Sequence, residues 1–340
     1  MMRIVLDAMG SDTHPGPEIE AAVESARHWG DTILLTGPED LLQPKLDALG
    51  IPKSIVEVVH SPEVLEMTDK PAEAARGKAL NSMAVGIDLL KGGKADVFVT
   101  AGNTGGAMAN ALFRLGRIRG VKRPSLAIII PVRGGYTAVL DIGANADCKP
   151  IFLVQFAIMG SIYVEKMLDI PSPRVGLLSI GEEPGKGNML VKETFPLLEI
   201  AGVNFIGNVE PKEIFAGEAD VVVTDGFSGN VFIKTSEAVA RFMSDIIRDE
   251  IKSSPISSVG GLLAKPAFRR VGLMLDPSEY GAAPLLGVDG LVFIGHGRSN
   301  AKALVSAIRV ARQAVSNRLL EATREVIQRR LADVNRKEEA

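Results

Sequence analysis

Short apolar runs, many of them β-branched, alternate with segments of helical periodicity along the chain, and this alternation constrains the fold more than any other feature. The runs that read as strands are residues 3–7, 32–36, 55–59, 96–100, 125–130, 136–141, 174–179, 203–206, 220–224 and 291–294. Such alternation is typical of βαβ units and a mostly parallel sheet. Several runs are apolar almost throughout, as expected when helices cover both faces of the sheet. We therefore predict a three-layer α/β/α sandwich.

The order of these segments also predicts local features. Residues 125–130 and 136–141 are separated by only a few residues that include Gly134 and Gly135, which predicts an antiparallel hairpin. No Pro-, Ser- or Gly-rich linker interrupts the chain, so we predict one domain over residues 1–340 with an amphipathic helical excursion at about 236–276. From Ser299 onward the pattern predicts one long helix.

Glycine follows the predicted strands more often than composition alone requires. The chain has 35 glycines in 340 residues, which is above the usual share of about 7%. Six strand ends combine glycine with Asp, Asn, Ser or Thr, in residues 7–12, 102–106, 141–145, 181–188, 225–230 and 295–300. Ligands of open α/β sheets bind beyond the carboxyl ends of strands, where helix N-termini attract anions. The pattern predicts an anion-binding rim.

Two of these segments resemble each other. Residues 95–106 and 219–230 share seven identities in twelve positions. The match predicts either two equivalent loops on one edge of the sheet or only the general preferences of strand-to-helix turns.

Composition and motifs exclude several classes of function. The formal charge is −3 and aromatic residues are 5% of the chain, which argues against nucleic-acid binding. The single Cys148 and four scattered histidines offer neither a disulfide nor metal-ligand spacing. No P-loop and no Gly-x-Gly-x-x-Gly fingerprint is present, so we expect no nucleotide cofactor and no metal. The lone cysteine and the lack of a signal-peptide pattern predict a cytoplasmic protein.

Seven motifs occur in an order that is specific when taken together. They are Asp7-Ala-Met-Gly-x-Asp12, Arg76-Gly-Lys78, Thr100-Ala-Gly-Asn-Thr-Gly-Gly106, Asp141-Ile-Gly-Ala-Asn145, Gly181-Glu-Glu183 with Lys186-Gly-Asn188, Asp225-Gly-Phe-Ser-Gly-Asn230 and Gly295-His-Gly-Arg-Ser-Asn300. With them the chain closely resembles, over nearly its whole length, the PlsX-type phosphate acyltransferases of bacterial phospholipid synthesis. One departure is Ser11, where glycine is frequent in that family.

The resemblance implies a fold, an activity and partners. The fold would be Rossmann-like and related to the isocitrate dehydrogenase and phosphotransacetylase type, in a homodimer. The activity would be transfer of a long-chain fatty acyl group from acyl carrier protein to inorganic phosphate, which gives an acyl phosphate for a membrane acyltransferase, without a cofactor. A phosphotransacetylase-like enzyme, an NAD-dependent decarboxylating dehydrogenase and a non-catalytic scaffold stay open as alternatives.

The resemblance also implies site residues. Lys186 and Asn230 would stand at the reacting centre, and His296 is either a general acid or a surface residue. The implied residues for binding phosphate or acyl phosphate are Asp7, Gly10, Asp12, Gly102, Asn103, Thr104, Gly105, Asn145, Gly187, Asn188, Ser228, Gly229 and Ser299. Any one hydroxyl or amide among them could instead be a helix cap.

Four carboxylates and the single cysteine carry further expectations. The carboxylates would repel phosphate, so we expect them to orient Lys186 or the loop amides; they are Asp7, Asp12, Asp141 and Asp225. Cys148 shows no nucleophile motif, so we expect an unreactive thiol.

Two basic segments suggest surfaces. Five cations without an acidic residue among them suit an acidic carrier protein or form a solvated helix end: Arg114, Arg117, Arg119, Lys122 and Arg123. Residues 256–275 mix basic and apolar side chains, including Leu262, Leu263 and Phe268. Such a segment can lie in a membrane interface, which would make the protein peripheral to the membrane, or can form a dimer contact.

Overall fold

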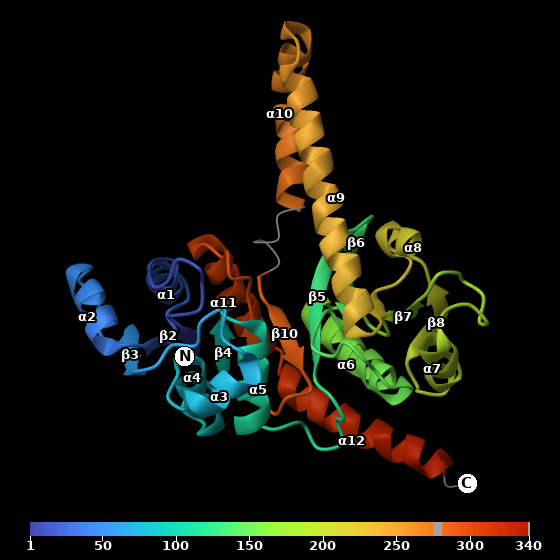
Figure 1. Ribbon diagram of the computed structural model, residues 1–340, viewed down its shortest axis with the longest axis horizontal. Coiled ribbons are helices and arrows are strands. Elements are labelled where there is room, and N and C mark those ends of the chain that lie inside the picture. Colours follow the sequence, from blue (N-terminus) through green and yellow to red (C-terminus); the bar gives the residue numbers. More distant parts are fainter. Residues whose placement is uncertain (275–280, 339–340) are drawn as a thin grey trace.

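A twisted sheet with helices on both faces forms the body of the protein in a computed structural model that describes residues 1–274 and 281–338 (Figure 1). Its eleven strands lie in the order β3-β2-β1-β4-β11-β10-β5-β6-β9-β7-β8. They are β1 (Arg3–Asp7), β2 (Thr32–Gly37), β3 (Val56–His60), β4 (Val97–Thr100), β5 (Ser125–Val132), β6 (Gly135–Leu140), β7 (Arg174–Leu178), β8 (Asn204–Val209), β9 (Val221–Val223), β10 (Ala283–Leu286) and β11 (Val292–Ile294). The predicted α/β fold class is confirmed.

The helices divide between the two faces. One face is covered by α1 (Gly16–Trp29), α6 (Pro150–Leu168), α7 (Met189–Glu199), α11 (Ala301–Ser316) and α12 (Leu319–Glu338), whose apolar residues share the largest buried cluster. The other face carries α4 (Ser82–Lys91), α5 (Thr104–Arg114) and α8 (Pro211–Ala216). The remaining helices are α2 (Glu39–Ala48), α3 (Pro71–Gly77), α9 (Gly226–Lys252) and α10 (Pro255–Met274). The three layers follow from apolar strands that bury both faces.

Three antiparallel pairings in the middle of the sheet reverse its direction. β11 pairs with β10, β10 with β5 and β5 with β6 in antiparallel fashion, while the flanking pairs are parallel. The predicted hairpin of β5 and β6 is thus confirmed. Because of the reversals, β9 runs opposite to β4, so the two similar segments do not leave the sheet by one edge. That prediction was wrong, because strand direction depends on pairing partners distant in sequence.

The register nevertheless brings both sets of strand ends together. Thr100 at the end of β4 aligns with Ile294, which pairs with Ala283. On the other side, Leu140 at the end of β6 aligns with Val223. Leu140 pairs with Ala127, next to the Leu126 that pairs with Leu285. The two halves therefore end on nearly the same line across the sheet, approached from opposite directions.

A helical hairpin of α9 and α10 projects from the sheet (Figure 1). Along α9, only Gly226, Gly229 and Ile233 are buried, and α10 has no buried residue. The hairpin includes residues 236–274 of the expected amphipathic excursion, whose residues 275 and 276 lie outside the described residues. Its exposed apolar side chains include Val239, Phe242, Leu262 and Leu263.

The C-terminal segment is two helices, so the prediction of a single helix from Ser299 was wrong. α11 ends at Ser316 with Asn317 as its C-cap, and Arg318 takes a left-handed φ of 53° before α12 begins. The side chain of Asn317 donates to the carbonyl oxygen of Lys166 on α6. This contact and the burial of Leu319 turn the chain onto α6, a tertiary effect that periodicity does not reveal.

One helix of the described residues, α6, is long and apolar enough to cross a membrane by length and composition, but 72% of the relevant window is buried inside the protein. This burial is typical of a core helix, which is the place of α6 in the layer that it forms on one face of the sheet.

Candidate active site

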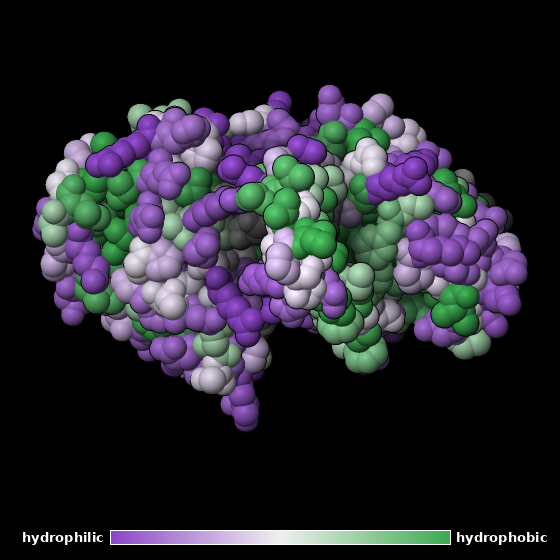
Figure 2. Space-filling view, turned by 90° about the horizontal axis from the view of Figure 1, so that it is seen from above, coloured by the Kyte–Doolittle hydropathy of each residue, from purple (hydrophilic) through white to green (hydrophobic). Residues whose placement is uncertain are grey.

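A large cleft of about 3000 Å³ begins where the strand ends of the two sheet halves meet and extends along the helices α9 and α10. Loops of the first half contribute Asp12, Gly102, Thr104, His296 and Ser299 to its lining. Loops of the second half contribute Gly143, Ser179, Gly187, Asn188 and Asn230. Figure 2 looks down onto the end of the helical hairpin, beside which the surface is hollowed. The cleft thus unites loops that the sequence only showed to be similar.

Asp7 supports the loops of the first half from below. Its carboxylate is fully buried and accepts hydrogen bonds from Thr100 Oγ1 at 2.6 Å and from the Met9 amide at 3.1 Å. Burial raises the pKa of Asp7 above its ordinary value. A Cβ at Gly10 would lie 2.9 Å from the backbone nitrogens of Ala101 and Gly102, so only glycine fits there. Asp7 and Gly10 therefore hold two loops together and do not themselves line the cleft.

Asp12 and the loop at residues 295–299 form a second contact of this half. The Asp12 amide donates to the Gly297 carbonyl at 2.7 Å, and the Ser299 amide donates to the His296 carbonyl at 2.8 Å. His296 Nδ1 accepts from the Arg298 amide at 3.2 Å. The neutral imidazole of His296 consequently carries its proton on Nε2. His296 is exposed and lines the cleft.

Two asparagines of the implied site act as helix caps. Asn103 Oδ1 accepts from the Gly106 amide at 2.9 Å at the start of α5. Asn188 Oδ1 accepts from the Val191 amide at 3.0 Å at the start of α7. Asn103 Nδ2 also donates to the Met67 carbonyl at 3.0 Å. Thr104 is exposed beside Gly102 and Gly105 on the cleft wall. The amide side chains thus shape the loops, while Thr104 and the backbone face the cleft.

Asp141 organises the loops of the second half. This buried carboxylate accepts hydrogen bonds from the amides of Leu126, Gly143, Ala144 and Asn145 and from Asn145 Nδ2. Burial raises the pKa of Asp141 above its ordinary value. Asn145 Nδ2 donates also to the Pro124 carbonyl at 2.7 Å. The amide group of Asn145 therefore donates its hydrogen bonds to groups of the protein itself.

The carboxylate of Asp225 caps the N-terminus of α9. Asp225 accepts from the Ser228 amide and from Ser228 Oγ, both at 2.8 Å. Gly229 packs against Asp141, whose carbonyl oxygen would be 1.9 Å from a Cβ at this position. One turn further, Asn230 is exposed, with Nδ2 beside Gly143, and its amide makes no hydrogen bond among the described residues. Asn230 is thus the free donor of this helix terminus.

Lys186 lies in the loop between β7 and α7. Its amide donates to the Glu183 carbonyl at 2.9 Å, and its methylene groups pack near Gly181. The ammonium group is exposed and has no ion-pair partner in the part of the chain that the structure describes. Lys186 itself is not part of the cleft wall, but the next residues, Gly187 and Asn188, are. An exposed cation therefore lies next to residues of the cleft wall.

The structure adds a residue that sequence reasoning missed. Ser179, directly after β7, lines the cleft and is 7% exposed, and its hydroxyl has no partner. Its position two residues before Gly181 was the only signal available in the sequence.

Cys148 is not placed as a nucleophile. Burial, together with the nearby Asp141 carboxylate, raises the pKa of the Cys148 thiol to about 12. The thiol donates to the Asn145 carbonyl at 3.6 Å. A neutral thiol with such a pKa has little nucleophilic thiolate near neutral pH.

The five basic residues near the end of α5 differ in their contacts. Arg114 pairs with Asp88, and Arg117 donates to the Lys122 carbonyl. The side chains of Arg119, Lys122 and Arg123 are exposed and make no contact of this kind among the described residues. Three free cations thus remain on this surface.

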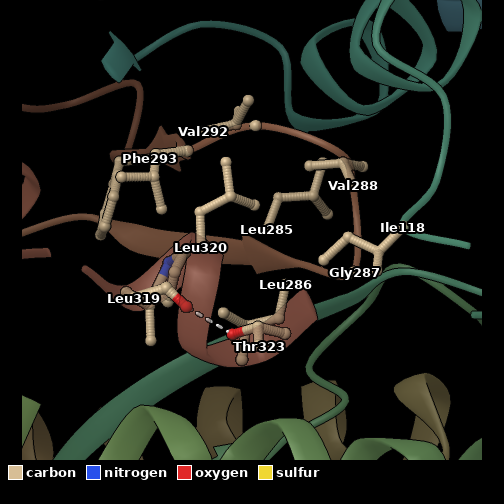
Figure 3. Close-up of a pocket in the computed structure, with 13 residues that line it drawn as sticks. Ile118, Leu285, Leu286, Gly287, Val288, Val292, Phe293, Leu319, Leu320 and Thr323 are labelled. Atoms are coloured by element: carbon tan, nitrogen blue, oxygen red, sulfur yellow. Dashed lines mark hydrogen bonds between the residues drawn. The ribbon is translucent and has the colours of Figure 1, made fainter. Parts of the chain in front are cut away.

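Two further observations concern alternative sites, a metal centre and a second hollow. Among the side chains that the structure describes, residues 1–274 and 281–329, no three His, Cys, Asp or Glu are grouped so that they could hold a metal ion. A small hollow of about 20 Å³ between β10, β11 and α12 is lined mainly by apolar side chains such as Leu285, Phe293 and Leu319 (Figure 3). It has room for roughly one water molecule and too few polar partners to hold one. The cleft is therefore the candidate site.

Comparison with known proteins supports one family. A family model described as fatty acid synthesis protein matches residues 2–322. A phosphate acyltransferase of Acidobacterium capsulatum is 47% identical over 323 residues, which cover 94% of this chain and 96% of that protein. Among solved structures, a phosphotransacetylase from Streptococcus pyogenes has a TM-score of 0.58 at 17% identity, covering 93% of this chain and 94% of that chain. A 4-hydroxythreonine-4-phosphate dehydrogenase from Klebsiella pneumoniae has a TM-score of 0.55 at 13% identity, covering 93% of this chain and 100% of that chain. At these identities the two structures show a shared fold.

Proposed function

The chain belongs to the fatty acid synthesis protein family of phosphate acyltransferases, and on that premise we propose that it transfers a long-chain fatty acyl group from acyl carrier protein to inorganic phosphate. The resemblance to the PlsX-type enzymes is confirmed, and the chain is an acyltransferase. The observation that carries the proposal is the cleft itself, which joins glycine-rich strand ends, free backbone donors and the exposed Asn230 amide, with the Lys186 cation at its border.

The proposed reaction needs no covalent acyl-enzyme, because phosphate is itself the nucleophile. A phosphate oxygen attacks the thioester carbonyl carbon, a C–O bond forms, and the C–S bond breaks. The products are an acyl phosphate and the carrier thiol, whose sulfur leaves as thiolate and takes up a proton. The work of the protein is to hold the two substrates together and to neutralise charge.

The free side chains of the cleft suit these tasks. Lys186 supplies a cation for phosphate or for the oxyanion that develops on the thioester, and Asn230 Nδ2 supplies an amide donor for the same oxygen. His296, with its proton on Nε2, can donate a hydrogen bond to the departing sulfur, and the thiolate then takes up a proton from water. Asp7, Asp141 and Asp225 are satisfied by hydrogen bonds within the protein, which supports a role in holding loops.

An apolar wall supports a fatty acyl substrate. Ile128 and Ile130 of β5 line the cleft together with Ile142 and Phe232. These side chains give the cleft an apolar wall beside the polar loops, and burying methylene groups against them is favourable by about 0.8 kcal/mol each. A short acyl group would leave most of this wall uncovered.

The helical hairpin supports two further parts of the proposal, a homodimer and attachment to the cytoplasmic face of the membrane. Near its tip, Ile256, Val259, Leu262 and Leu263 are exposed, and basic residues follow them on α10. Such a segment suits a membrane surface, where an acyl phosphate would pass to a membrane acyltransferase. Along the stem, exposed Val239, Phe242 and Ile246 recur at helical spacing on α9, and we assign this face, part of which also lines the cleft, to contact with a second copy. Arg119, Lys122 and Arg123 form the surface that we assign to the acidic carrier protein.

The decisive experiment mixes the purified protein with an acyl carrier thioester and inorganic phosphate. We expect a phosphate-dependent product that hydroxylamine converts into a hydroxamate. Formation of product only from acyl coenzyme A would favour a phosphotransacetylase-like enzyme, and reduction of NAD would favour a dehydrogenase. No reaction with any of these substrates would favour a scaffold.

A further inference from the structure

The loop between β7 and α7 contains an unsatisfied polar group that nothing described above uses. Seven buried side-chain oxygens lack a hydrogen-bond partner among the described residues, on Ser11, Glu18, Ser25, Asn110, Ser125, Ser179 and Asn208. Of these residues only Ser179 lines the cleft. Leaving a buried polar group unpaired is destabilising, so such a group points to a missing partner.

Ser179 stands under the first turn of α7. Its Oγ lies 3.0 Å from the place where a Cβ at Gly187 would be, and Gly187 has a left-handed φ of 97°. Any side chain at Gly187 would also meet Val191 at 2.7 Å. The glycine therefore keeps the space in front of the Ser179 hydroxyl open.

The helix terminus at this place has free donors. Asn188 Oδ1 accepts the Val191 amide, and the Lys192 amide donates to the Asn188 carbonyl. The amides of Met189 and Leu190 precede the first intrahelical bond and make no hydrogen bond among the described residues. With eleven residues, α7 is long enough to carry the partial positive charge of a helix N-terminus.

The neighbouring Asn208 adds a second unsatisfied atom. Its Nδ2 donates to the Glu183 carbonyl at 2.8 Å, which fixes the orientation of the amide and leaves Oδ1 as the acceptor without a partner. Asn208 pairs with Leu177, and Ser179 follows Leu177 by two residues, so both polar side chains lie on the same face of the sheet. Two unsatisfied polar atoms therefore lie on one face of this part of the sheet, and of the two side chains Ser179 is the one that lines the cleft.

Charges around the loop are compatible with an anion there. Glu182 and Glu210 each pair with Lys212 at 3.3 Å, whereas Lys186 is free. At the start of α9, by contrast, the Asp225 carboxylate already occupies the Ser228 amide and hydroxyl. A doubly charged ligand would be repelled from that helix terminus.

We propose that, among the glycine-rich strand ends, the seat of the nucleophilic phosphate is the part of the cleft between Ser179 and the first turn of α7, with Ser179 Oγ as a direct hydrogen-bond donor. This inference rests on the proposed function and assigns one of its substrates to one loop. It separates the phosphate from the Asn230 region, which is left to the thioester carbonyl.

The test compares Ser179→Ala with a matched control. Ser25 on α1 is likewise buried and its hydroxyl has no partner among the described residues, but it is not part of the cleft, so Ser25→Ala makes the same chemical change elsewhere. We expect Ser179→Ala to raise KM for phosphate about tenfold or more, the effect of a hydrogen bond to a charged group, and to leave KM for the acyl thioester unchanged. Ser179→Cys fills similar space with a weaker donor, so its KM for phosphate should lie between those of the wild type and of Ser179→Ala. Ser25→Ala should leave both constants unchanged.

A second measurement does not need turnover. Inorganic phosphate should raise the Tm of the wild-type protein and of Ser25→Ala, but much less that of Ser179→Ala. An unchanged KM for phosphate and an unchanged phosphate effect on Tm in folded Ser179→Ala would overturn the inference, and would mean that only a buried water sits there. Equal rises in KM for phosphate and in KM for the acyl thioester would also overturn it, because they would indicate that Ser179 has a structural role. Failure of the proposed function would instead show as no phosphate-dependent product from the wild-type protein.

Discussion

Asn145 donates two hydrogen bonds to Oδ2 of Asp141, from its backbone amide at 2.7 Å and from Nδ2 at 2.9 Å. Three other backbone amides donate to Oδ1 of the same carboxylate. A single buried carboxylate therefore shapes the turn after β6. At the other half of the cleft, Asp7 plays a similar part with Thr100 and Met9.

This arrangement predicts that Asp141→Asn destabilises the protein. Both carboxylate oxygens accept N–H groups, and the substitution turns one of them into an NH₂ group that faces donors. We expect a loss of about 1–3 kcal/mol in the free energy of unfolding, measured by urea titration. As a control, Asp147→Asn, at an exposed position close in sequence, should leave the urea midpoint unchanged. An unchanged midpoint in Asp141→Asn would contradict the role of Asp141.

Lys186→Ala should abolish most turnover without harming the fold. Its ammonium group is exposed and unpaired among the described residues, so its removal leaves no buried partner. We expect kcat/KM to fall by about 10²–10³, as for the loss of one charge-stabilising donor, while the Tm is retained. Lys192→Ala removes an exposed lysine from α7 and should keep full activity. Full activity of Lys186→Ala would remove Lys186 from the reaction.

Cys148 should be unreactive in the folded protein and dispensable. Because the pKa of its thiol is about 12 instead of the ordinary 9.0, Ellman's reagent should react slowly at pH 8 and fast after unfolding. Cys148→Ala should retain turnover. A fast native reaction together with an inactive Cys148→Ala would revive the cysteine as a nucleophile.

The same pKa predicts a pH effect on stability. As pH rises above 9, the unfolded chain loses the thiol proton while the folded protein retains it up to about 12. The unfolded state then binds fewer protons than the folded state, so the free energy of unfolding decreases with rising pH in this window. Urea titrations at pH 8 and pH 10 should show a smaller decrease for Cys148→Ala than for the wild type.

Reversing the free cations beyond α5 should weaken recognition of the carrier protein. We expect the double change Arg119→Glu and Arg123→Glu to raise KM for the acyl carrier thioester about tenfold at low salt, with KM for phosphate unchanged. The effect should shrink as salt screens the charges. Lys53→Glu, at an exposed position elsewhere, is the control. If KM for the thioester stays constant, the carrier protein docks on another surface.

The hairpin should separate membrane binding from dimerisation. Changing Leu262, Leu263 and Phe268 to Ser should stop flotation with anionic phospholipid vesicles and keep the Tm, because these side chains are exposed in the monomer. Val239→Ser with Phe242→Ser, on the stem, should reduce the dimer in light scattering but keep flotation. If the first variant still floats, the tip does not bind the membrane.

Local patterns in the sequence predicted the elements and the fold class well. The run at residues 3–7 is β1 residue for residue, and the hairpin of β5 and β6 follows from its short connection. Glycines of several predicted strand ends line one cleft, among them Gly102, Gly143 and Gly187. These features are predictable because propensity and periodicity act within a few residues.

Other features depended on contacts between distant segments. The turn at Asn317 forms against α6, and the reversal of β9 relative to β4 arises from three antiparallel pairings in the middle of the sheet. Likewise, no pattern in the sequence distinguishes Asn103 and Asn188, which cap helices, from Asn230, whose amide is free.

The sequence by itself determined that this chain alternates strands and helices and places glycine with small polar residues after the strands. Only the tertiary structure decided that strands of opposite direction end on one line and that Ser179 is buried there without a partner. The physical reason is that secondary structure reflects short-range preferences, whereas burial and hydrogen bonding of a side chain depend on what the rest of the chain packs against it.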